Sequence, residues 1–164
     1  MKKPGCYFYL EKERNKDLLI AFNKLYEESN TVNAEFYEKL SQSQARRFWV
    51  SEERAAIVLA RMEHGDNLAD MIPSRRRMFH DLYTVFSHLK DIHPSCSVFD
   101  LACMAVNSQA PSFYLTPKSM KEIICRIKRK WYDKNNRYRI SSPRTSAGNQ
   151  SSMQPSTPSQ ERAL

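Results

Sequence analysis

Apolar side chains recur every three or four residues over several stretches of the chain, and this spacing gathers them on one face of an α-helix. In the first half the pattern predicts helices over about residues 17–28, 33–41 and 51–64. In the second half it predicts helices over about residues 75–92, 97–106 and 117–132. The sequence therefore predicts an all-α protein with three helices in each half.

The third helix of each half has the clearest boundary signals. Ser51 can accept a hydrogen bond from the free amides of a first helical turn, and the acids that follow it suit the positive end of the helix dipole. Gly65 follows the last turn, at the place where glycine commonly stops a helix in the left-handed conformation. In the second half Thr116 is the predicted cap and Pro117 the first helical residue, which is a favoured pairing.

The two halves also share sequence. The stretch SQARRFWVSEERAAIVLARM (43–62) aligns without a gap with SQAPSFYLTPKSMKEIICRI (108–127), and five of the 20 aligned positions are identical. Upstream, the Asp, Leu, Phe and Leu of positions 17, 18, 22 and 25 recur at positions 81, 82, 86 and 89. This period is too long for a solenoid repeat and predicts a tandem duplication of a domain-sized unit.

Each predicted unit is a bundle of three helices that is helix-turn-helix-like. Unit one covers residues 7–64 and unit two covers 74–132, with a linker over 65–73. Residues 133–164 are the predicted tail, which is basic at first and then rich in Ser and Pro. Such a composition cannot bury enough apolar surface to offset the entropy lost on ordering, so we expect the tail to be disordered.

An aromatic pair precedes each third helix, Phe48-Trp49 in unit one and Phe113-Tyr114 in unit two. Their closeness to a helix cap favours a packing role, in which they anchor the loop to the core. An exposed platform on which nucleic-acid bases stack is the alternative.

The two third helices differ in the side chains that face away from the core. In unit two one apolar stripe lies opposite a cationic face, which predicts a helix that is open to solvent or a ligand on one side. The stripe consists of Met120, Ile123, Ile124, Ile127 and Trp131.

In unit one the third helix is apolar nearly all round, because Ala56, Ile57 and Ala60 stand where unit two has polar side chains. We therefore expect it to be buried on more than one side, against unit two or against a second subunit. This surplus apolar face is the basis of an alternative function, a helical module that binds a protein partner or associates with itself.

The net charge of +8 lies in the last third of the chain. Residues 1–114 hold 15 basic and 15 acidic side chains, whereas residues 115–164 hold 11 basic and three acidic ones. A focused cationic segment favours a polyanionic partner. We predict a nucleic-acid-binding protein, foremost for duplex DNA, that acts as a regulator or accessory factor; RNA is a further alternative. The candidate contact residues are Lys118, Ser119, Lys121, Arg126, Lys128, Arg129, Lys130, Lys134, Arg137 and Arg139.

Several other classes of protein are disfavoured by the sequence. The chain has three glycines, too few for a glycine-rich phosphate loop, and no apolar run long enough to span a membrane. The four cysteines form no C-x-x-C pair, and their spacings with His88 and His93 fit no standard zinc module. We expect a cytoplasmic protein that is not an enzyme and carries no metal or cofactor.

The blocks ARRFWVSEERAAIV and APSFYLTPKSMKEII resemble those of a family of short, basic, uncharacterised bacterial proteins, over most of residues 7–130. The resemblance implies no catalytic or binding residues. The layout of two three-helix units is also loosely similar to tandem Myb-like, helix-turn-helix proteins.

Overall fold

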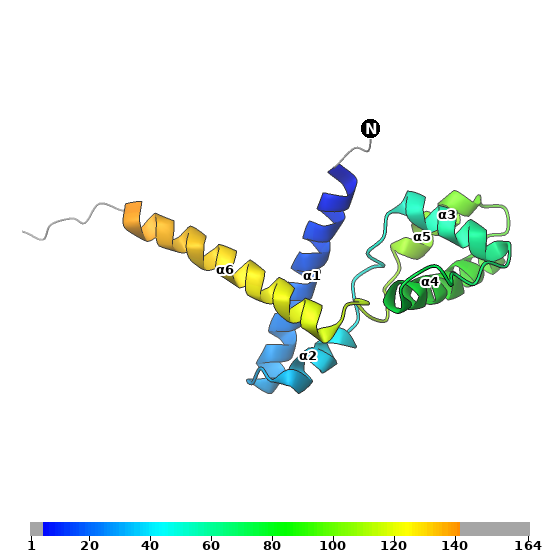
Figure 1. Ribbon diagram of the computed structural model, residues 1–164. Helices are drawn as coiled ribbons and strands as arrows, with labels where there is room; N and C mark the ends of the chain where they lie inside the picture. The colour runs from blue at the N-terminus through cyan, green and yellow to red at the C-terminus, as the bar shows by residue number, and fades with distance from the viewer. Residues whose placement is uncertain (1–4, 142–164) are drawn as a thin grey trace, which may run out of the picture.

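The computed structural model describes residues 5–141, with the side chains of residues 8–135, and that part of the chain is all-α as predicted. Six helices follow one another along it (Figure 1). Their bounds are α1 Gly5–Ser29, α2 Ala34–Ser41, α3 Glu52–Glu63, α4 Pro73–Ile92, α5 Val98–Val106 and α6 Pro117–Ser141.

The boundaries of α3 confirm the signals in the sequence. The Ser51 side chain accepts a hydrogen bond from the amide of Arg54 at 3.3 Å. At the other end Gly65 has a φ of +88°, and its amide donates to the carbonyl of Met62 at 2.9 Å. The amide of Asp66 reaches back to the carbonyl of Arg61 at 3.1 Å, which completes a Schellman motif.

Two helices are longer than the sequence pattern predicts. α1 begins at Gly5, twelve residues before the predicted start, because the charged stretch EKERNK over residues 11–16 favours a helix without marking an apolar face. α6 continues to Ser141, so the predicted tail over 133–164 begins too early. No proline interrupts α6 before Pro143. The rest of the predicted tail lies outside the described residues.

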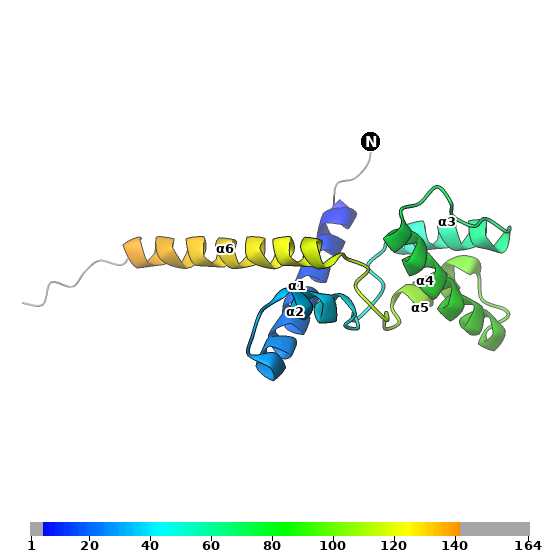
Figure 2. The same ribbon diagram turned by 60° about the horizontal axis from the view of Figure 1, so that its bottom comes forward.

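The helices pack in two groups that cross the predicted unit boundaries. α6 packs against α1 and α2, while α3 packs against α4 and α5. Figure 1 shows these groups as two lobes, and Figure 2 shows α6 projecting from the first of them. The ranges 7–64 and 74–132 are therefore not the packing units of this protein, because each half contributes its third helix to the other half's lobe.

Two crossover segments, residues 42–51 and 107–116, run between the lobes. Ala45 and Ala110 pair as an antiparallel bridge, with reciprocal backbone hydrogen bonds of 3.0 and 3.1 Å. The side chains of Gln44 and Gln109 bond to each other at 2.9 Å. Both pairs join residues that are aligned with each other in the comparison of the two halves, so the two crossover segments contact each other at aligned positions.

The aromatic pairs before the third helices serve the packing role. Phe48 and Phe113 are buried, and the ring of Phe48 stacks on that of Tyr114 at 6.3 Å. The Tyr114 hydroxyl donates a 2.6 Å hydrogen bond to Asp81 of α4. Burial first, and then this bond, raise the pKa of Tyr114 far above its usual value. Trp49 is half-buried, and the guanidinium groups of Arg46 and Arg47 each lie 5.7 Å from the centre of its ring. Neither aromatic pair is therefore an open stacking platform.

Candidate nucleic-acid interface

α6 starts with the capping arrangement that the sequence predicts. The Thr116 hydroxyl accepts a hydrogen bond from the amide of Ser119 at 3.2 Å, and Pro117 occupies the first helical position. Past this cap, α6 buries Met120, Ile123 and Ile124 against α1 and α2. One side of the helix is therefore fixed to the lobe, and the opposite side is left to solvent.

The solvent side of α6 is a row of cations. Side chains three, four or seven positions apart lie on one side of an α-helix, and on α6 the side chains of this side are exposed from Lys118 to Arg129. We call this side the cationic face; it consists of Lys118, Lys121, Glu122, Cys125, Lys128 and Arg129, among which Glu122 is the one acid. The exposed Arg126 and Lys130 lie along its flank. The predicted one-sided amphipathic helix is thus present over residues 118–132.

The cations of α6 differ from many others in the chain in having no carboxylate partner. Arg14, Lys16, Arg47, Arg61 and Lys90 all form ion pairs in α1, α3, α4 or the crossover segments. Among the side chains that the structure describes, none of those on α6 forms an ion pair. Within the described part of the protein, the cations of this helix are therefore not held in ion pairs, although Glu122 and Asp133 on the same helix offset part of their charge.

The remaining predicted contact residues have varied surroundings. Ser119 is half-buried in the cap, where its hydroxyl accepts a 2.9 Å hydrogen bond from Thr116, so it is not free for a base. The Lys128 ammonium lies 4.2 Å from the centre of the Phe22 ring of α1. Lys134 is exposed. Arg137 and Arg139 belong to the last turns of α6, beyond the described side chains.

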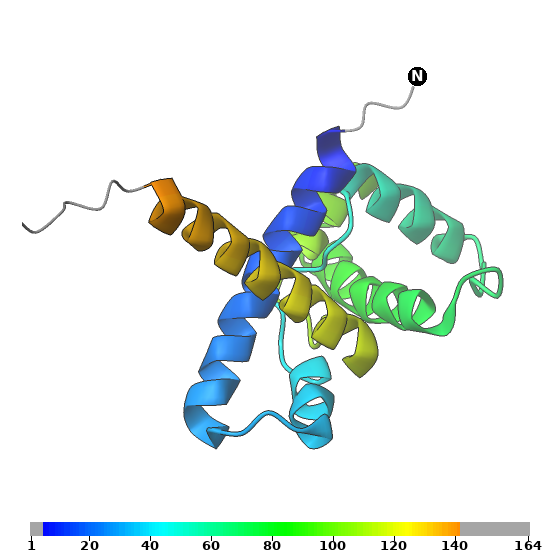
Figure 3. The ribbon, with the colours of Figure 1, turned by 60° about the vertical axis from the view of Figure 1, so that its left-hand side comes forward.

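The helix-turn-helix geometry expected from the sequence is not formed by α5 and α6. In that motif the two helices pack on each other across a short turn. Here they belong to different lobes, and the crossover segment 107–116 separates them. α6 instead crosses α1 and runs on beyond it, as Figures 1 and 3 show from two directions.

Sequence reasoning missed the aromatic residues at the projecting end of α6. The apolar stripe predicts that Trp131 is buried, but 60% of its surface is exposed, as is 62% of that of Tyr132. The stripe outruns the lobe, because α6 has 25 residues and its neighbour α2 only eight. The sequence carries one signal of this overhang, because the helix predicted over 117–132 is longer than the helix predicted over 33–41.

The surplus apolar face of α3 is mostly used inside the protein. Ala55, Val58 and Leu59 are buried in the second lobe, and Ala56 and Ala60 are half-buried. α3 packs against both α4 and α5, as expected for a helix that is buried on more than one side, but this burial does not extend to Ile57, which is 56% exposed. A single exposed isoleucine is a small surface for a stable protein partner.

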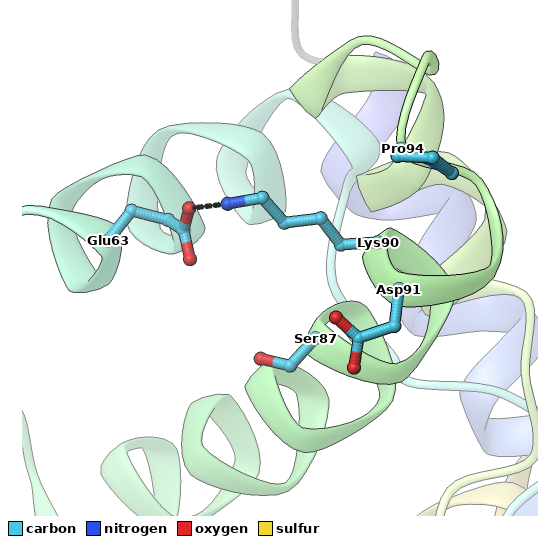
Figure 4. A pocket seen from close by; sticks show the side chains of 5 residues that line it. All are labelled: Glu63, Ser87, Lys90, Asp91 and Pro94. Carbon is cyan, nitrogen blue, oxygen red and sulfur yellow. Dashed lines mark hydrogen bonds and ion pairs between the residues drawn. The ribbon is translucent and has the colours of Figure 1, made fainter.

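A hollow between α3 and α4 holds a second group of charged side chains (Figure 4). Glu63 accepts hydrogen bonds from Lys90 and, at 2.9 Å, from the Tyr83 hydroxyl. These bonds, that of Lys90 above all, lower the pKa of Glu63. Ser87 and Asp91 line the same hollow. Because the carboxylate is already bound by its neighbours, this arrangement is one that holds α3 on α4.

Within residues 5–141, no helix combines the length and the apolar character that crossing a bilayer requires. In the same part of the chain, His, Cys, Asp and Glu side chains do not gather in threes that could hold a metal ion.

Comparisons with family models, with curated proteins and with solved structures give no match.

Proposed function

We propose that this protein binds nucleic acid, foremost duplex DNA, through the cationic face of α6, as a regulator or accessory factor. The observation that carries the proposal is a row of exposed cations without carboxylate partners on one side of a projecting helix. The phosphate oxygens of a nucleic acid supply the negative partners that these cations do not have in ion pairs, and the release of condensed counterions drives such binding.

The shape of α6 suits this partner. At 1.5 Å per residue its 25 residues span about 37 Å, and an α-helix fits the major groove of B-form DNA. Because the apolar stripe packs against α1 and α2, the cationic face already points outward before binding. No free energy is then needed to order it when the ligand binds. Lys121, Lys128 and Arg129 are the central phosphate contacts in this proposal, with Arg126 and Lys130 at its flank.

We also infer that the fold arose by tandem duplication, with the third helices of the two copies exchanged. The paired Ala45 and Ala110 support this inference, because they occupy equivalent repeat positions. The reciprocal packing of α3 and α6 supports it too. Under this proposal the first copy supplies an apolar third helix that builds the second lobe, and the second copy supplies the cationic one that binds the ligand.

The experiment is a fluorescence anisotropy titration of labelled duplex DNA at low salt with the full chain. A triple variant, Lys121→Glu, Lys128→Glu and Arg129→Glu, should lose binding. The matched control is a second triple variant, which makes the same change in charge at exposed cations outside α6 and should retain most of the affinity for DNA. Its substitutions are Lys12→Glu, Lys24→Glu and Arg54→Glu. Equal losses in both variants would mean that net charge, and not the cationic face, controls binding. An absence of binding by the wild type would remove the proposal.

A further inference from the structure

Trp131 and Tyr132 are two large aromatic side chains exposed side by side near the projecting end of α6. Their rings lie 5.3 Å apart and nearly perpendicular, at 80°. More than half of each side chain is open to solvent. Isolated exposed apolar residues are common, but a fixed pair of exposed aromatic rings is a typical recognition feature.

The exposure follows from where α6 leaves the lobe. Ile124 is 1% exposed, Ile127 is half-buried and Trp131, one further turn along the same stripe, is 60% exposed. The stripe thus emerges gradually from under α1 and α2. Tyr132 lies on the same side of α6 as the cationic face, one turn beyond Lys128 and Arg129.

The charges around the pair determine which partner can cover it. Lys128, Arg129, Lys130 and Lys134 surround it along the helix, and Asp133 is the single acid between them. All of these side chains are exposed. A second copy of the chain docked symmetrically over Trp131 would bring these like charges together, which opposes association. A polyanion that also carries flat apolar rings matches both the charge and the aromatic surface.

We propose that Trp131 and Tyr132 form a stacking site for unpaired bases of single-stranded nucleic acid, next to the phosphate-binding cationic face. This inference rests on the proposed function and narrows its ligand to a duplex that carries a single-stranded segment. Bases within a duplex are stacked on each other and do not present a free face, whereas unpaired bases stack on exposed aromatic side chains with little dependence on sequence.

The experiment compares three labelled DNA probes against the full chain at one low salt concentration. The first is a blunt duplex, the second adds a short oligothymidylate overhang, and the third adds an overhang of equal length without bases. We expect the overhang with bases to bind most tightly, while the baseless overhang adds only a small electrostatic gain. Replacing Trp131, which lies outside the cationic face, by Ala should weaken binding of the second probe roughly fivefold to a hundredfold and leave binding of the blunt duplex nearly unchanged.

Two further variants separate stacking from other roles. Trp131→Phe keeps an aromatic face and should retain most of the preference for the overhang, whereas Trp131→Ala should lose it. Phe8→Ala removes an aromatic side chain on α1 that is 70% exposed, and should change nothing. Each variant is checked for native helix content by circular dichroism.

The possible results are distinct. Equal binding of the blunt and overhang probes by the wild type would overturn this inference and leave the proposed function standing. A failure to bind any probe would remove the proposed function. If Trp131→Ala turns a dimer into a monomer in light scattering and leaves the preference for the overhang intact, the pair is a self-association surface and the inference is wrong.

Discussion

The packing of α6 on α1 and α2, and of α3 on α4 and α5, makes a specific prediction about which parts of the chain lose stability together. Phe22 of α1 is 3% exposed, and its ring meets that of Phe36 in α2 at 5.1 Å. Phe86 of α4, which is aligned with Phe22 in the sequence comparison of the two halves, is fully buried in the other lobe. Replacing either with Ala removes a buried aromatic ring from one lobe, so the two variants are matched in chemistry and differ in location.

The expected loss of stability for each variant is about 3–5 kcal/mol, as is usual when a buried Phe is truncated to Ala. This is a large fraction of the total stability of a typical domain. Since each 1.4 kcal/mol corresponds to a factor of ten, amides that exchange by opening of the affected lobe should exchange about two to four powers of ten faster.

Hydrogen exchange of the native protein measures this effect along the chain. For Phe22→Ala we expect faster exchange in α2 and in α6, although α6 is distant in sequence. For Phe86→Ala we expect it in α3 and α5. Faster exchange in α3 with an unchanged α6 after Phe22→Ala would mean that the units are consecutive, and would refute the exchanged packing.

Three other substitutions test local features of the fold. Tyr114→Phe removes the 2.6 Å hydrogen bond to Asp81 and leaves a half-buried carboxylate without this donor. The free energy of unfolding, measured in urea, should therefore fall by about 1–3 kcal/mol, and an unchanged value would contradict the role of the bond. Ser51→Ala removes the cap of α3 and should cost about 1 kcal/mol in the same assay, while Ser51→Thr should cost little; equal effects would argue against capping. The hydrogen bond from Lys90 holds the pKa of Glu63 below its usual 4.5. The ionised carboxylate therefore stabilises the fold above pH 4.5, and this contribution to the free energy of unfolding is lost as the pH falls through the lowered pKa. Glu63→Gln should therefore be less stable than the wild type at about pH 7, and the difference should shrink as the pH falls below 4.5; a difference that grows on acidification would contradict this sign.

The sequence was sufficient to predict the helices, because their signals are local. The cap at Ser51, the stop at Gly65 and the Thr116-Pro117 start each depend on a few neighbouring residues, and the structure confirms all three. The start of α1 was missed, since long charged side chains support a helix without leaving an apolar period.

The choice of packing partner could not be predicted in the same way. An apolar stripe such as Met120 to Ile127 shows that a helix has a buried side, but the stripe fits α1 and α2 as well as it fits α4 and α5. The surplus apolar residues of α3 did indicate contact with the other half, and α3 does pack there. The exposure of Trp131 depends on where the lobe ends, which only the assembled fold determines.

The most direct test of the account is the salt dependence of binding to blunt duplex DNA by the wild-type chain. The cationic face has four cations, and Arg126 and Lys130 at its flank bring the total to six. At about 0.9 counterions per phosphate contact, a plot of log affinity against log salt should have a slope between about −3.6 and −5.4. Affinity should then fall by roughly a hundredfold to a thousandfold between about 50 and 200 mM salt. No binding at the lower concentration, or binding that hardly changes over this range, would contradict the claim that these cations contact phosphates.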